Sequence, residues 1–178
     1  MGKSVYIPYD LWMLMDSSNS LIVPSWVLNE DYITSFNISN NEVLKRIVIG
    51  DNCFGKVKEF ELDGLNELES VVIGQQSFRT SGDGSYRIMN CPKLASIQTG
   101  GQSFTDYESF ELNNLPSLQF INLGGNSFNR APTFSLTGLI KCIGIHSQIF
   151  LNYNRSNLVV LYSVLFVRLC LRVIDWMD

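Results

Sequence analysis

The stretch LKRIVIGDNCF at residues 44–54 returns as LQFINLGGNSF at residues 118–128, and this likeness decides the fold. Both stretches begin with Leu, carry Ile three residues later and another apolar residue two positions further, and then present Gly, Asn and Phe at matched offsets. Two further copies begin at Leu68 and Leu94, so successive copies are 24, 26 and 24 residues apart. Self-similarity at such a period predicts a solenoid in which each copy forms one coil.

The first half of each copy has apolar residues at its first, fourth and sixth positions. The fourth and sixth positions alternate as the side chains on one face of a short strand do. The Gly after them suits a turn, and the amide at the ninth position can bond backbone groups of its own coil and of the next one. We therefore expect a structural ladder of amide side chains formed by Asn52, Gln76, Gln102 and Asn126.

The second half of each copy contains another alternating segment, in which an aromatic residue is followed two positions later by Leu or Ile. Pro92 and Pro116 stand just before the next opening Leu, where they disfavour a long helix. We expect short strands on both sides of the coil and little helix in residues 33–141, with helix, if anywhere, at the C-terminus. The alternating segments begin at Phe60, Tyr86, Phe110 and Phe134.

The I-x-I-G-x-x-S-F block and the NLPSLQ joint at residues 114–119 resemble the irregular leucine-rich repeats of protist and some bacterial surface proteins. The resemblance covers roughly residues 33–141. It implies a curved, right-handed leucine-rich repeat solenoid that binds other macromolecules through its concave strand face. It implies neither catalytic residues nor a cofactor.

The segments that flank the repeats are expected to act as caps, because the end coils of a solenoid would otherwise expose apolar faces. Residues 1–32 are predicted to form an N-terminal cap, residues 33–141 the repeats, and residues 142–178 a degenerate coil followed by an apolar C-terminal cap. Arg168 and Arg172 would make a membrane span costly, so we do not expect a membrane partner. An insertion in RTSGDGSY (79–86) predicts a surface loop, either tolerated or used in binding.

Composition and motifs point away from several function classes. The net charge is −4, with 13 basic residues and no Lys/Arg block, which argues against nucleic acid as a partner. The single His146 and the lack of metal-ligand spacing favour a non-enzymatic protein without cofactors. We see no secretory signal in the first residues. Cysteines separated by whole coils should stay reduced, which favours an intracellular setting, although the glycosylation patterns at Asn37 and Asn154 point the other way.

The candidate binding site consists of the exposed positions of the first predicted strand in each of the four copies. Their apolar members form a patch that a partner would cover. We therefore hypothesise a protein partner of unknown identity, and as the alternative a structural protein that self-associates end to end into an oligomer or fibre. The candidate partner-binding residues are Arg46, Val48, Ser70, Val72, Ser96, Gln98, Phe120 and Asn122.

Overall fold

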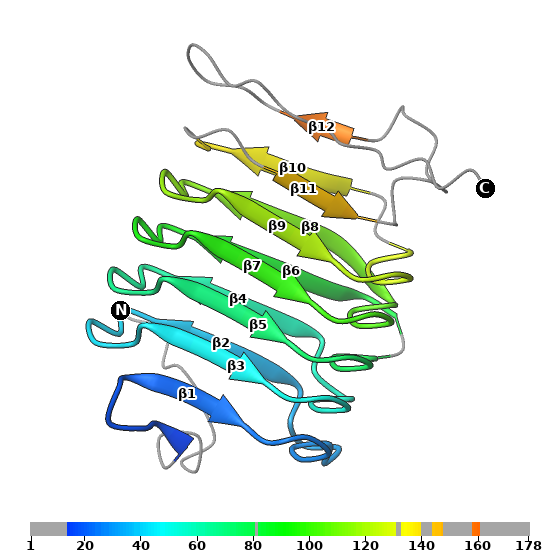
Figure 1. Ribbon diagram of the computed structural model, residues 1–178. Coiled ribbons are helices and arrows are strands. Elements are labelled where there is room, and N and C mark those ends of the chain that lie inside the picture. The colour runs from blue at the N-terminus through cyan, green and yellow to red at the C-terminus, as the bar shows by residue number, and fades with distance from the viewer. Residues whose placement is uncertain (1–13, 81, 131–132, 140–143, 148–157, 161–178) are drawn as a thin grey trace, which may run out of the picture.

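The computed structural model describes residues 14–80, 82–130, 133–139, 144–147 and 158–160, and there the chain coils between two parallel β-sheets (Figure 1). Successive strands alternate between the sheets, so one holds the odd-numbered strands and the other the even-numbered ones. We call them the odd sheet and the even sheet. The described residues contain no α-helix. The protein is a parallel β-solenoid.

Within each sheet, every strand pairs in parallel with the strands of the preceding and following coils. The odd sheet contains, in spatial order, β1 (Ser20–Val23), β3 (Arg46–Ile49), β5 (Ser70–Ile73), β7 (Ser96–Thr99), β9 (Phe120–Leu123) and β11 (Gly144–Ser147). The even sheet contains β2 (Ser35–Ser39), β4 (Glu59–Asp63), β6 (Gly84–Met89), β8 (Tyr107–Asn113), β10 (Thr133–Thr137) and β12 (Leu158–Val160).

The strands form where apolar and polar residues alternate. In β3, Ile47 and Ile49 are buried and Arg46 is exposed, and in β4 Phe60 and Leu62 are buried. The apolar side chains thus point between the sheets and the polar ones outward. This confirms the expected strands on both sides of the coil, and the near absence of helix, for the described part of residues 33–141. The expectation for the C-terminal end lies largely outside the described residues.

Two columns of stacked aromatic rings fill the space between the sheets. Neighbouring rings within a column are stacked, with centroids 4.7 Å apart for Phe60 and Tyr86 and for Phe78 and Phe104. Rings of different columns meet edge to face, as Tyr86 and Phe104 do at 5.0 Å. Such pairs add about 0.5–1.5 kcal/mol to the burial of each ring. One column contains Phe36, Phe60, Tyr86 and Phe110, and the other Phe54, Phe78, Phe104 and Phe128.

The second column stands on an unusual backbone. Phe54, Phe78, Phe104 and Phe128 have φ values of 57°, 56°, 55° and 51°, in the left-handed region that bulky residues rarely occupy. That conformation costs roughly 1–2 kcal/mol per residue. Each of these rings is fully buried, and burying an aromatic side chain contributes more than this cost. Ring packing therefore maintains the strained turn in each of these four coils.

A ladder of side-chain hydrogen bonds runs along the same turn. It is formed by the residues that directly follow the Asn and Gln residues of the predicted ladder. Ser77 Oγ donates to the carbonyl of Gly50 at 2.9 Å and accepts a bond from Cys53 N at 3.1 Å. Ser103 and Ser127 repeat this arrangement in the following coils. The hydrogen bonds expected from the amides are thus made by the residues one position later. Gln102 and Asn126 are exposed, and Asn52 and Gln76 are half-buried.

The first coil begins inside the segment predicted to be an N-terminal cap. Leu21 lies beside Ile47, and Val23 beside Ile49, in the register of the odd sheet. Trp26 and Leu28 have the positive φ values of the equivalent turn residues in later coils. Residues 20–28 therefore form the first half of a coil, and β2 in the even sheet completes it. In front of it, an antiparallel bridge joins Met15 to Leu21 at the outer edge of β1.

Past residue 142, the described parts of the chain continue both sheets. β11 pairs with β9 in the odd sheet, and β12 pairs with β10 in the even sheet. The rest of the predicted degenerate coil and C-terminal cap, including Cys142, Arg168 and Arg172, lies outside the described residues. Within the described residues, no helix has the length and apolar character needed to cross a bilayer.

Candidate functional site

The outer face of the odd sheet brings the sequence-predicted residues together in two rows that cross the strands. The register places equivalent residues of successive coils side by side, and Ser70 pairs with Ser96 as Val72 pairs with Gln98. Each row therefore presents one side chain per coil, about 4.8 Å from the next. One row contains Arg46, Ser70, Ser96 and Phe120, and the other contains Val48, Val72, Gln98 and Asn122.

These rows differ in how far their side chains reach into solvent. Phe120 is the most prominent, with 60% of its surface exposed. Arg46, Gln98 and Asn122 are also exposed. Between them, Ser70 and Ser96 are small and half-buried, as are Val48 and Val72. The face thus has an aromatic residue on β9, an aliphatic region on β3 and β5, and small polar residues between the two.

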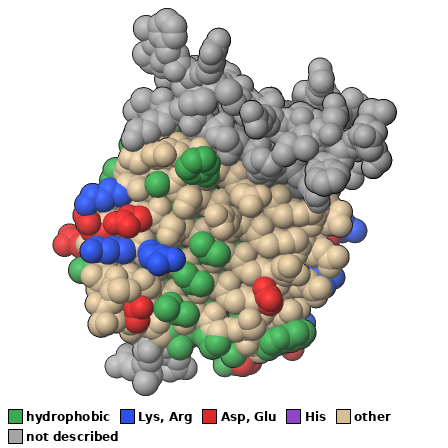
Figure 2. Space-filling view, viewed as in Figure 1, with side chains coloured by type: hydrophobic (Ala, Val, Ile, Leu, Met, Phe, Trp, Pro, Cys, Tyr) green, Lys and Arg blue, Asp and Glu red, His purple; other side chains and the backbone are tan. Residues whose placement is uncertain are grey.

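One residue of this face was not predicted from the sequence. Ile22 on β1 extends the row of Val48 and Val72 and is 44% exposed. The signal was present, because Leu21-Ile22-Val23 repeats the pattern of Ile47-Val48-Ile49. It was hidden because this coil has Pro24 where later coils have Gly, and it lacks the Phe. Figure 2 shows hydrophobic side chains gathered over the strands of the odd sheet.

Charge is nearly absent from the centre of this face. Among the outward positions of β1, β3, β5, β7 and β9, Arg46 is the only charged residue. Other charges lie just before the strands, where Lys93 Nζ bonds both carboxylate oxygens of Glu67 at 2.7 Å. The odd-sheet face is therefore a weakly polar surface bordered by charge on one side.

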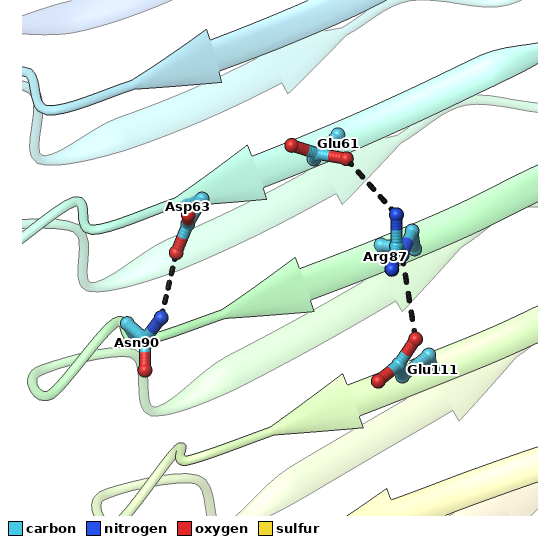
Figure 3. A network of polar contacts seen from close by, with 5 residues as sticks. All are labelled: Glu61, Asp63, Arg87, Asn90 and Glu111. Carbon is cyan, nitrogen blue, oxygen red and sulfur yellow. Dashed lines mark hydrogen bonds and ion pairs between the residues drawn. The ribbon is translucent and has the colours of Figure 1, made fainter. Parts of the chain in front are cut away.

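The even sheet presents the opposite character. Arg87 lies between Glu61 and Glu111 of the neighbouring strands, with N–O distances of 3.4 and 3.3 Å (Figure 3). Asn90 Nδ2 donates to Asp63 Oδ1 at 2.8 Å on the same side of the molecule. Exposed ion pairs of this kind contribute about 0–1 kcal/mol each. Arg87, Glu61 and Glu111 therefore present charges that are already paired with one another.

Metal-binding clusters and thiols are two kinds of chemical group that the described residues allow to be checked. They contain no cluster of three His, Cys, Asp or Glu side chains that could hold a metal ion. Cys53 and Cys91 are free and buried, and burial raises the pKa of both thiols, that of Cys91 to about 11. Thiols with such pKa values are protonated at neutral pH and react poorly. The Gly after each odd-sheet strand from β3 to β9 lies at a turn, as expected, and a Cβ at Gly100 would lie 2.5 Å from the backbone nitrogen of Gln75.

Fold and face together define a parallel β-solenoid with one weakly charged, partly apolar surface. Comparison with protein-family models, with curated proteins and with solved structures finds no match for this chain. The functional argument therefore depends on the chain's own residues.

Proposed function

We propose that this protein is a non-enzymatic repeat module of the leucine-rich type and that it binds a protein partner through the odd-sheet face. The repeat period and the buried opening residues Leu44, Leu68, Leu94 and Leu118 support the assignment to this type. The Gly that follows each odd-sheet strand from β3 to β9 also fits it. Under this proposal the solenoid is a rigid support, and its outward side chains provide the specificity.

The contrast between the two faces is the observation that carries the proposal. The even-sheet face holds charges that pair with one another, as Arg87 does with Glu61 and Glu111. The odd-sheet face holds Ile22 and Phe120 in the open, with Arg46 as its one charge among the described outward positions. Cores of protein interfaces are depleted in charge and enriched in aromatic residues. Of the two faces, the odd-sheet face therefore suits a protein partner better.

The test compares the same substitution on the two faces. Ser96 lies between Ser70 and Phe120 in the odd sheet, and Ser109 lies between Ser85 and Thr133 in the even sheet. Both serines are half-buried. Ser96→Arg should place a long charged side chain in the centre of the proposed interface, and Ser109→Arg is its matched control. Circular dichroism and thermal unfolding establish that both variants keep the fold.

Tagged wild-type protein and the two variants are then used to capture partners, which are identified by quantitative mass spectrometry. The proposal expects a partner that Ser96→Arg loses by about tenfold or more and that Ser109→Arg retains. Retention of every partner by Ser96→Arg would overturn it, and the loop at Gly82–Gly84 would become the next candidate surface. Recovery of the chain itself alone would favour the end-to-end structural role.

A further inference from the structure

The insertion between Phe78 and Tyr86 interrupts the regular coil. The corresponding spacing is six residues between Phe54 and Phe60 and eight residues here. The inserted chain reaches β6 through Gly82 and Asp83, both of which have positive φ values of 74° and 59°. No atom lies within 4 Å of a Cβ placed on Gly82, whereas Gly84 is buried. The insertion is therefore open at its tip and enclosed where it joins the sheet.

Tyr107 of the following coil encloses that junction. In the sheet register Tyr107 lies beside Gly84 and Ser109 beside Ser85, so the pairing skips Glu108. A Cβ on Gly84 would lie 2.6 Å from two atoms of the Tyr107 ring. The ring therefore occupies the space that any side chain at position 84 would need.

The Tyr107 hydroxyl reaches past this coil to the one before it. It donates a buried hydrogen bond of 2.7 Å to the carbonyl of Val57, which lies two residues before β4. The order of strands in the even sheet is β8, β6, β4, so the bond joins two coils that are not neighbours. A buried carbonyl without a partner would cost about 1–3 kcal/mol. Tyr107 thus supplies the Val57 carbonyl with a hydrogen bond from two coils away.

The position of Tyr107 in the repeat explains its size. Val57 stands three residues after Phe54, and Tyr107 stands three residues after Phe104, and both are fully buried. In the coil between them, the position three residues after Phe78 falls within the insertion. A Val-sized residue in the following coil would leave the space over Gly84 unfilled. The phenol fills this space and also reaches the carbonyl beyond it.

We propose that Tyr107 and Gly84 form a latch across the insertion, so that the longer connector, the missing side chain at position 84 and the large residue at position 107 depend on one another. The latch packs the end of the insertion against the solenoid, where the chain enters β6. Through the bond from Tyr107 to Val57, it also joins the coil after the insertion to the coil before it. The proposal goes beyond the partner-binding role and does not depend on it.

A double-mutant cycle on the full chain tests this dependence. In one variant, residues 79–85 are replaced by the five-residue connector of residues 55–59, which restores the six-residue spacing and returns Val to the row. In the second variant, Tyr107→Val removes the latch, and the third variant combines both changes. Tyr107→Phe, which keeps the ring and removes the hydroxyl, measures the bond to Val57 alone.

Each single change should lower the melting temperature by roughly 5 °C or more, the first by collision with the ring and the second by leaving a void. The combined variant should melt at or above the less stable of the two single variants. Losses that simply add in the combined variant would overturn the proposal, since independent sites add. Tyr107→Phe should melt below wild type, and an unchanged melting temperature would overturn the role of the hydroxyl.

Discussion

Ser103 Oγ donates a 2.8 Å hydrogen bond to the carbonyl of Gly74 and accepts one of 3.2 Å from the backbone nitrogen of Ser77. A single hydroxyl thus satisfies two backbone groups of the preceding coil. Ser103 is fully buried, so water does not replace it. Backbone groups at the turns of a solenoid otherwise have no strand partner, and Ser77, Ser103 and Ser127 each supply one to the preceding coil.

Ser103→Ala should therefore lower the free energy of unfolding by about 1–3 kcal/mol, because it leaves both backbone groups buried and unsatisfied. Urea denaturation followed by circular dichroism measures the change. Gln102→Ala is the matched control, since the neighbouring side chain is exposed, and it should cost about 0.5 kcal/mol or less. Asn126→Ala, which a ladder of amides would make costly, should resemble the control. Equal losses at positions 102 and 103 would contradict the serine ladder.

The aromatic columns predict that two phenylalanines, Phe104 and Phe120, contribute very differently to stability. Phe104 stacks between Phe78 and Phe128 and is fully buried, whereas Phe120 is exposed on the odd-sheet face. Phe104→Ala should cost about 3–5 kcal/mol through the cavity it leaves. Phe120→Ala should change stability by about 0.5 kcal/mol or less. Equilibrium unfolding of the two variants checks this, and a large loss at Phe120 would show that its ring is packed in solution.

Much of the fold could be predicted because the repeat preserves burial at fixed offsets. Ile47, Val71 and Ile97 occupy one position of the pattern, and all three are buried with 0% exposure. The alternation around Phe60 likewise predicted the second sheet. Such positions are determined by local period alone, so four aligned copies were enough to place them.

The ladder could not be placed because two adjacent positions carry equally regular polar residues. Asn or Gln fills one, and Ser or Cys fills the next in all four copies. The alternation of apolar residues does not decide which of the two points inward, and Gln76 adopts a φ of 56° that Gln seldom takes. Local propensity gives no warning of this turn. The same turn, with Trp26 and Leu28 in place of Asn and Phe, hid the first coil and with it Ile22.

Thr99 offers a test in which a substitution should stabilise the protein. It occupies the buried position held by Ile49, Ile73 and Leu123 in other coils, is 4% exposed, and its hydroxyl has no hydrogen-bond partner among the described residues. Thr99→Val keeps the shape and removes the unsatisfied oxygen, so it should raise the free energy of unfolding by about 1 kcal/mol. Thermal unfolding measures it, with the half-buried, outward-facing Thr137→Val as the control. A destabilised Thr99→Val variant would mean that the hydroxyl has a partner in solution.

Alkaline pH should lower the free energy of unfolding, because the protein buries cysteine thiols and tyrosine hydroxyls. Burial raises the pKa of Cys91 from an ordinary value near 9 to about 11, and it also raises the pKa of Cys53, Tyr86 and Tyr107. For a thiol whose pKa is higher in the folded state, the contribution to stability is complete below pH 9. It is lost as the pH rises through 11, because the unfolded chain releases its proton first. The free energy of unfolding should therefore fall between pH 9 and pH 11.

Cys91→Ala isolates the contribution of one thiol. The variant will be less stable at every pH because it loses buried volume, so the informative quantity is the slope of the unfolding free energy against pH. That slope should be shallower in Cys91→Ala than in wild type between pH 9 and pH 11, since one titrating group has been removed. Denaturant unfolding at pH 8, 9, 10 and 11 under reducing conditions gives both curves. Parallel curves would contradict the prediction, because Cys91 would then titrate in the folded protein as it does in the unfolded chain.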